Sequence, residues 1–356
     1  MAPSHPDSVD DWIHSAVGSY WPGAWVTRLE PMQGDASTRR FWRAWLEQGR
    51  AAAAPATAVL VDLGPQDVPR YARELGLLPE PLPEPLVLNA HRFLTRIGVA
   101  VPAIYVAAPH VRRLLVEDLG DASLYALVVR TPARAGELYR LALDELLRLQ
   151  GEGSRHPDPG CLAFSVAYDR RLFRWEMEQF LAYGIPAVAP DSDVDDLRGE
   201  IDRLADLLGA LPRVFSHRDY HYRNLMVQET GGKPRLRVID YQDALMAPNA
   251  QDLAVLLTTR ETGEIITPEL EAEMLQYYAE CARAAGILAL DDAQFLRSYR
   301  WCVLQHALKV IGLFAYLEHH GKPGYGAYLP AALGQARRML RADGEWPALS
   351  RALERP

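Results

Sequence analysis

The sequence predicts an α+β fold with two lobes, a small β-rich N-terminal lobe and a larger helical C-terminal lobe. Strand-like runs cluster in the first third of the chain, and long stretches with helical periodicity dominate after residue 121. A polar loop followed by two short strand-like runs interrupts the helical part. The 356 residues, of which 49% are hydrophobic and 24% charged, suffice for two or three packed units. We expect the lobes to be residues 1–117 and 118–356.

The N-terminal lobe is expected to be a small sheet with one internal helix, preceded by another helix. Ser8 stands before an amphipathic run, which is typical of a capped helix. The expected strands are residues 25–32, 40–46, 58–63, 104–108 and 113–117. Prolines crowd residues 64–85, which predicts a loop, and residues 86–97 predict a helix that stops at Gly98.

The C-terminal lobe is expected to consist mainly of long helices. Apolar residues recur there at three- and four-residue intervals, the spacing that places them on one helix face. The five expected helices are residues 135–150, 168–183, 194–208, 268–285 and 293–318. The polar loop at residues 217–224 therefore lies inside this larger lobe.

Composition excludes several classes of protein. The formal charge of −8, without a basic stripe, argues against a general nucleic-acid binder. No apolar run reaches the about 18 residues that a membrane span needs. The 3 cysteines are far apart and the N-terminus does not resemble a signal peptide, so we expect a reduced, cytoplasmic protein. The sequence does not indicate an oligomeric state.

The most informative pattern is His-Arg-Asp-Tyr-His-Tyr-Arg-Asn at residues 217–224. Asp219 stands five residues before Asn224, and Asp240 follows sixteen residues later at the end of an apolar run. Phosphoryl transfer from a magnesium nucleotide needs a carboxylate for the attacking hydroxyl, an amide oxygen on one magnesium and a carboxylate bridging the metals. Protein kinases arrange these groups in this order. An ordinary polar surface loop is the alternative.

The residues between Asn224 and Asp240 predict a β-hairpin. Two apolar runs, residues 225–227 and 236–239, flank a turn that contains Gly231 and Gly232. The two strands of such a hairpin hold Asn224 and Asp240 on neighbouring backbones. An ordinary surface loop does not require an aspartate at that place.

A turn between the first two strands is the candidate phosphate-binding loop. Glycine permits a tight turn, backbone N–H groups bind phosphate oxygens, and hydroxyls add donors. The candidate residues are Gly34, Asp35, Ala36, Ser37 and Thr38. The pattern matches neither common glycine-rich phosphate motif, so a plain hairpin turn is the alternative.

The third strand lacks the lysine that protein kinases carry there, and Val61 takes its place. We expect Arg40 or Arg43 to supply the cation, since arginine grips phosphate with two donors, or else both are exposed strand residues. The hinge should follow the fifth strand, where the backbone of Glu117 and Leu119 would meet the adenine. Asp121 is interpreted chiefly as a helix cap.

Five motifs in the chain together resemble a known enzyme group. They are residues 34–37, 115–121, 217–221, 239–244 and 305–310. They resemble the anomeric sugar kinases, which phosphorylate N-acetylmuramate and N-acetylglucosamine at the anomeric hydroxyl. These kinases belong to the aminoglycoside phosphotransferase and choline kinase-like group. The resemblance spans about residues 30–335 in the family's order, and the missing lysine fits this subgroup.

The resemblance implies a two-lobed protein-kinase-like fold, ATP as co-substrate, Mg²⁺, and an amino sugar salvaged from peptidoglycan. It implies that Asp219 is the catalytic base and that Asn224 and Asp240 hold magnesium. His217 is expected to order the loop, and Asp252 to brace it.

The sugar site is less well defined by the sequence. Tyr220, His221, Gln242 and Asp243 flank the catalytic carboxylates, and either bind sugar hydroxyls or pack behind the site. Gln305 and Lys309 share a helix face. Lys309 either meets the lactyl carboxylate of a muramic acid or pairs with a structural acid.

Two other functions remain open from the sequence. In one, the same chemistry serves another alcohol, such as an aminoglycoside or a choline-like acceptor. In the other, the chain is a non-catalytic kinase-like binding module, which the missing lysine favours and the three intact site residues oppose. Neither the preference between muramate and glucosamine nor that between ATP and GTP follows from the sequence.

Overall fold

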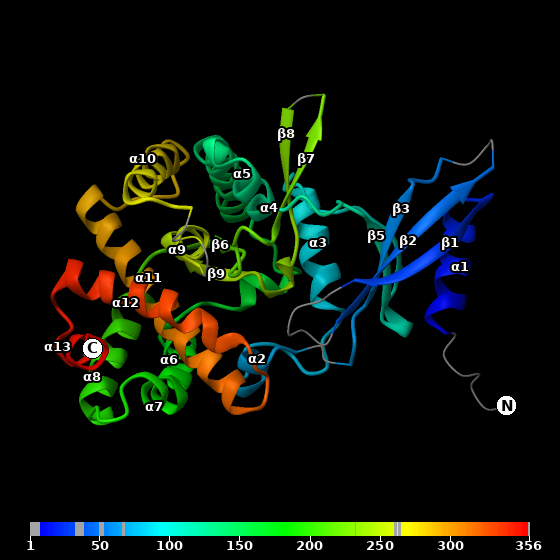
Figure 1. Cartoon of the computed structure of the whole chain (residues 1–356). Helices are drawn as coiled ribbons and strands as arrows, with labels where there is room; N and C mark the ends of the chain where they lie inside the picture. Colours follow the sequence, from blue (N-terminus) through cyan, green and yellow to red (C-terminus); the bar gives the residue numbers. More distant parts are fainter. Residues whose placement is uncertain are drawn as a thin grey trace.

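The computed structural model describes residues 8–32, 39–49, 53–65, 68–231, 233–259, 262 and 265–354. Figure 1 shows a β-sheet from the first third of the chain at one end of the molecule and the helices of the remainder at the other. Helix α3 (Leu86–Arg96) lies between them. The expected α+β architecture is therefore present.

The sheet has five antiparallel strands in the order β1-β2-β3-β5-β4. Their bounds agree with the expected strands to within two residues: β1 Ala24–Met32, β2 Arg40–Gln48, β3 Thr57–Asp62, β4 Ile104–Ala108 and β5 Arg113–Glu117. Helix α1 (Val9–Tyr20) precedes the sheet, and the side chain of Ser8 accepts a hydrogen bond from Asp11 N, as a helix cap does.

The two faces of the sheet bury different partners, because side chains alternate along a strand. One face packs against α1, with Leu46, Leu60 and Leu115 from the strands meeting Ile13 and Val17. The other face turns toward α3 and the rest of the molecule. Its apolar residues are Phe41, Val59, Val61, Leu63 and Leu114, packed with Val87 and Leu88 of α3.

Helix α3 and the short helix α2 (Arg70–Glu74) bury their apolar side chains in the larger core, although they precede residue 117. Phe93 of α3 lies against Phe215, with ring centroids 5.0 Å apart. The larger core thus includes a segment from the first third of the chain. A lobe boundary at residues 117–118 stays a prediction.

The larger lobe contains all five expected helices and several further elements. The helices are α4 Leu124–Arg130, α5 Ala135–Arg155, α6 Arg170–Gln179, α7 Ile185–Val188, α8 Val194–Gly209, α9 Ala250–Thr258, α10 Pro268–Ala284, α11 Asp292–His319, α12 Leu329–Asp343 and α13 Pro347–Leu353. A π-helical turn, Phe180–Gly184, continues α6. No helix in the described ranges has both the length and the apolar character for a membrane crossing.

Two small two-stranded sheets frame the polar loop. Strand β6 (Arg213–Ser216) pairs with β9 (Leu245–Pro248), and β7 (Leu225–Thr230) pairs with β8 (Lys233–Val238) as the expected hairpin. Figure 1 shows the β7–β8 hairpin beside α5, on the side of the larger lobe that faces the sheet. The loop at residues 217–224 therefore begins at the end of β6 and ends at the start of β7.

Candidate active site

The loop between β6 and β7 is anchored from behind by Asp252, on α9. The backbone N–H groups of His217 and Arg218 each donate to its carboxylate over 2.8 Å. Asp252 is completely buried, and burial raises its pKa. His217 is also buried, and its Nε2 lies 2.9 Å from the carbonyl oxygen of Ile239. Both side chains hold the loop to its neighbours, the arrangement expected of supporting residues.

The hairpin places Asn224 and Asp240 side by side. Leu225 is paired with Val238, and Ile239 N donates to Asn224 O over 3.0 Å. The side-chain amide of Asn224 is oriented by its Nδ2, which donates to the carbonyl of Asp219 over 3.0 Å. Its Oδ1 is therefore the atom that can serve a cation. The structure thus brings the three predicted catalytic and metal residues together.

Two non-glycine residues of this region have left-handed backbone conformations. Arg218 has φ 76° and Asp240 has φ 64°. Such conformations cost about 1–3 kcal/mol each and persist where surrounding contacts enforce them, often at functional sites. Here the contacts are the hydrogen bonds from the loop to Asp252 and to Ile239.

Asp219 lies among positive charges. Burial alone would raise its pKa, but the charges of Lys309 and Arg218 outweigh burial and lower the pKa to about 2. The carboxylate is therefore ionised at neutral pH and ready to accept a hydrogen bond from a hydroxyl group.

A buried ionic cluster lies beside Asp219, centred on Glu176 of α6. Its carboxylate pairs with Arg218 Nη2 at 2.8 Å and with Lys309 Nζ at 3.2 Å. Burial would raise the pKa of Glu176, but Lys309 and Arg218 lower it overall. Arg218 also stacks over the ring of Tyr71 at 3.9 Å and lies 3.6 Å from Asp243. Lys309 thus pairs with a structural acid, one of the two alternatives left open by the sequence.

An arginine that the sequence analysis passed over reaches this site from the sheet. Arg39, directly before β2, has its Nη2 at 2.5 Å from Asp240 Oδ1 and its Nη1 at 2.8 Å from Gln242 Oε1. This ion pair joins the end of the sheet to the predicted metal-binding aspartate. Glu176 and Tyr71 were also missed, since their role depends on contacts between elements far apart in sequence.

Two residues expected to contact the sugar are placed elsewhere. Tyr220 is fully buried, and its hydroxyl donates to Ala142 O of α5 over 2.8 Å, behind the loop. Gln305 is also fully buried, with its Nε2 3.0 Å from Glu176. Both support the site from the interior. By contrast, His221, Gln242 and Asp243 are only partly buried, close to the catalytic loop.

The two arginines that were predicted to bind the nucleotide phosphates, Arg40 and Arg43, form ion pairs with acids of the protein. Arg40 is exposed and pairs with Asp62, with the atoms 3.0 Å apart, on the α1 face of the sheet. Arg43 pairs with Asp118 at 2.7 Å and with Asp121 at 2.8 Å, next to the hinge. Asp121 therefore does not cap α4; the side chain of Ser123 does. The two arginines differ because they occupy opposite faces of the sheet.

The remaining nucleotide-binding predictions concern the hinge and the turn. The N–H of Glu117 donates to Ala103 O over 2.8 Å, and its carboxylate pairs with Arg237 of β8. Leu119 is partly buried between β5 and α4, so its backbone is the better candidate for adenine. The predicted turn residues lie outside the described residues: Gly34, Asp35, Ala36, Ser37 and Thr38.

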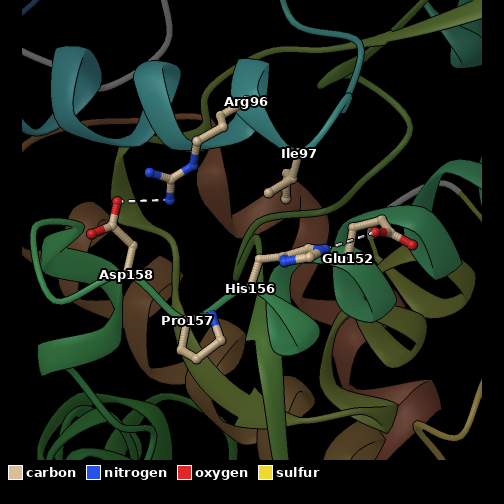
Figure 2. A pocket seen from close by; sticks show the side chains of 6 residues that line it. All are labelled: Arg96, Ile97, Glu152, His156, Pro157 and Asp158. Atoms are coloured by element: carbon tan, nitrogen blue, oxygen red, sulfur yellow. Dashed lines mark hydrogen bonds and ion pairs between the residues drawn. The ribbon is translucent and has the colours of Figure 1, made fainter.

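A separate cavity of about 510 Å³ opens near the C-terminal end of α3. Figure 2 shows that its polar side chains face one another, Arg96 with Asp158 and His156 with Glu152. None of the described residues that line it belongs to the catalytic loop. Because Arg96 already pairs with Asp158 and His156 lies against Glu152, we do not assign the cavity to the nucleotide or to the sugar.

Comparison with known proteins identifies the family. The model of the phosphotransferase enzyme family matches residues 28–289. The N-acetylmuramate/N-acetylglucosamine kinase of Pseudomonas aeruginosa is 31% identical over 331 residues, which cover 90% of this chain and 87% of that protein. The protein of the same name from Neisseria meningitidis is 32% identical over 256 residues, covering 69% and 72%.

Solved structures agree on the fold. An ethanolamine kinase from Plasmodium vivax superposes with a TM-score of 0.60 at 12% identity, covering 96% of this chain and 93% of that one. The ADP-bound aminoglycoside phosphotransferase APH(2'')-Ib gives a TM-score of 0.54 at 14% identity, covering 92% and 97%. The predicted two-lobed, kinase-like fold is confirmed. The chain therefore belongs to the phosphotransferase enzyme family, as its motifs predicted.

Proposed function

We propose that the protein transfers the γ-phosphoryl group of ATP to the anomeric hydroxyl of N-acetylmuramic acid or N-acetylglucosamine, forming the sugar 1-phosphate. The observation that carries this proposal is the convergence of Asp219, Asn224 and Asp240 at one hairpin in a kinase-like fold. Relatives about one-third identical over most of their length bear the name of this sugar kinase. The product would feed cytoplasmic reuse of peptidoglycan sugars.

The donor set at the hairpin fits a magnesium ion. Mg²⁺ prefers one or two protein oxygens together with phosphate oxygens and water. Asn224 offers Oδ1, because its Nδ2 is engaged by Asp219 O, and Asp240 offers a carboxylate that already attracts the cationic Arg39. When bound, the ion would neutralise phosphate charge. The family implies ATP as the co-substrate.

The roles of the protein groups follow from their positions. Asp219 orients the anomeric hydroxyl and accepts its proton as the phosphoryl group moves across. Its low pKa keeps it ionised beforehand. Asp252 and His217 fix the loop, so that the carboxylate needs little rearrangement during the reaction. His221, Gln242 and Asp243 are the proposed contacts for sugar hydroxyls, and the backbone of Leu119 is the proposed contact for the adenine.

An aminoglycoside is a poorer fit as the acceptor. A polycationic substrate needs carboxylates that are free to meet its ammonium groups. Near the catalytic loop, Glu176 pairs with Arg218 and Lys309, and Asp243 lies 3.6 Å from Arg218. These acids already have cationic partners within the protein.

The direct test is incubation of the protein with Mg-ATP and a panel of acceptors, followed by location of the new phosphate by phosphorus NMR. The panel contains both proposed sugars, kanamycin, choline and the methyl glycoside of N-acetylglucosamine, whose anomeric oxygen is blocked. We expect phosphate on the anomeric oxygen of a free sugar and none on the methyl glycoside. Phosphorylation of the methyl glycoside would refute the proposed position.

The Asp219→Asn variant tests the base assignment in the same assay. An asparagine cannot accept the proton, so turnover should fall by at least about a hundredfold. Nucleotide binding, measured by calorimetry, should remain close to that of the unmodified protein. Full turnover in this variant would show that another group activates the hydroxyl.

A further inference from the structure

We infer that Arg39 is the cation that contacts the nucleotide phosphates, in the role that a third-strand lysine has in protein kinases. The inference rests on the proposed use of a magnesium nucleotide, but not on the identity of the acceptor. It is carried by the position of Arg39 in the sheet and by its contacts with Asp240 and Gln242.

Side-chain alternation separates Arg39 from its neighbour Arg40. Phe41 packs with Val61 on the sheet face that turns toward α3, and residues two apart on a strand share a face. Arg39 is two residues before Phe41 and its guanidinium lies at Asp240, on that side of the sheet. Arg40 pairs with Asp62 on the opposite face. Two adjacent arginines therefore serve different surfaces.

The register of the sheet places Arg39 close to the position of the missing lysine. Phe41 of β2 is the partner of Val61 in β3. The backbone of Arg39 is therefore displaced from that of Val61 by one strand across the sheet and by two residues along the strand. These offsets correspond to about 4.8 Å across the sheet and about 7 Å along it. An arginine side chain is long enough to make up such a difference, and the guanidinium of Arg39 reaches Asp240.

The contacts of Arg39 hold its guanidinium at the metal end of the site. Asp240 accepts from Nη2 and Gln242 accepts from Nη1, and the guanidinium also lies 5.9 Å from the ring centroid of Phe41. A guanidinium so placed can bind two phosphate oxygens at once. If Asp240 turns to a magnesium ion that arrives with the nucleotide, the phosphates of that nucleotide become the natural partners of Arg39.

Two other basic residues near the site, Arg43 and Lys309, are paired with acids away from Asp240. Arg43 shares the sheet face of Phe41, but its guanidinium is held by Asp118 and Asp121 through four hydrogen bonds. Lys309, on α11, is paired with Glu176. Arg39 is therefore the best placed of these residues for the phosphates.

The test compares Arg39→Ala with Arg40→Ala, a matched control one residue away on the opposite face. Binding of ATP, ADP and adenosine is measured by calorimetry, with and without Mg²⁺. We expect Arg39→Ala to weaken ATP and ADP binding by about tenfold to a hundredfold, as loss of a charged hydrogen bond does, and to leave adenosine binding unchanged. Arg40→Ala should bind all three like the unmodified protein.

A conservative variant adds a second readout. Arg39→Lys keeps the charge but not the two-pronged geometry, so its ATP affinity should lie between those of the unmodified protein and Arg39→Ala. Equal weakening of adenosine and ATP binding, or no weakening of either, would overturn the inference. The binding assay needs no sugar, so it stands even if the acceptor proves to be another alcohol.

Discussion

Lys309 contributes to the site through charge. It pairs with Glu176, its side chain is only 19% exposed, and its charge is the strongest of those that lower the pKa of Asp219. At the scale of the single residue, we therefore propose that Lys309 helps to keep the proposed base ionised. This assignment differs from contact with a lactyl carboxylate, and the two can be separated by experiment.

The Lys309→Met variant should raise the pKa of Asp219, because burial then acts with less opposition. In the unmodified protein the pKa of about 2 predicts no loss of kcat/KM from protonation of Asp219 down to about pH 5. In the variant the acid limb should move to higher pH, equally for both amino sugars. The measurement is the pH profile of kcat/KM with each sugar.

Lys322, exposed beyond the end of α11, provides the control through Lys322→Met. This variant should leave the profile unchanged. If Lys309→Met impaired only the reaction with N-acetylmuramic acid and left the acid limb in place, then Lys309 would contact the lactyl group.

At the scale of elements, the close approach of α11 to the π-helical turn after α6 determines how Lys309 meets Glu176. A Cβ atom at Gly312 would lie 2.4 Å from Phe180 N and 2.6 Å from the carbonyl carbon of Gln179. Backbone cannot yield at these distances as a flexible side chain does. Glycine at residue 312 therefore allows α11 to lie directly on this turn.

The Gly312→Ala variant should be destabilised by about 1–3 kcal/mol, or more, because the added methyl group forces the two helices apart. Its activity should fall as well, since Lys309 and Glu176 lie on the separated elements. Denaturant unfolding measures the change in free energy. Gly199→Ala is the control, because a Cβ atom at that exposed helical glycine would meet no atom of the described residues within 4 Å. Alanine should raise the free energy of unfolding there by up to about 1 kcal/mol, because it favours the helix more than glycine does.

The long elements could be predicted from the sequence because their apolar spacing is strong. The five strands of the sheet and helices such as α5 and α11 lie close to the expected ranges. The four-residue strands β6 and β9 were not predicted, since so short a pattern is common in loops. The sequence was sufficient to predict that Arg40 and Arg43 lie on different faces of the sheet. They are three residues apart on one strand, so they had to occupy opposite faces.

The candidate site was predictable where it is local and unpredictable where it depends on packing. One hairpin carries Asn224 and Asp240, and turn chemistry between two apolar runs indicates a hairpin. The cluster around Glu176 joins α6, α11 and the catalytic loop, and no sequence spacing encodes that meeting. Tyr220 and Gln305 were misplaced for the same reason.

At the scale of the whole molecule, the resistance of the fold to acid depends in part on His306. This residue is 8% exposed, and burial, followed by the charge of Lys309, lowers its pKa to about 3. The unfolded chain takes up a proton on this imidazole at about pH 6.5, while the folded chain does not. The stability that this neutral imidazole contributes is therefore fully present above about pH 6.5 and is lost as the pH falls toward 3.

The His306→Gln variant should remove this contribution, which amounts to about 1.4 kcal/mol per pH unit in the affected range. The free energy of unfolding, measured by denaturant titration at a series of pH values, should show a shallower slope than in the unmodified protein. His14→Gln, which alters an exposed residue of α1, should retain the original slope. An unchanged slope in His306→Gln would mean that other groups govern the acid sensitivity.

The packing of α3 has a consequence for how substrates enter. Because α3 buries Phe93 and Leu94 in the larger core, the sheet and α1 are the part with a core of its own, which meets α3 through Val87 and Leu88. The chain passes between that part and the rest three times: after β3, before β4 and after β5. We therefore expect substrates to enter when the sheet and α1 rotate away from the larger lobe about these three connections. The ion pair between Arg39 and Asp240 would hold the two parts together and would have to break for this rotation.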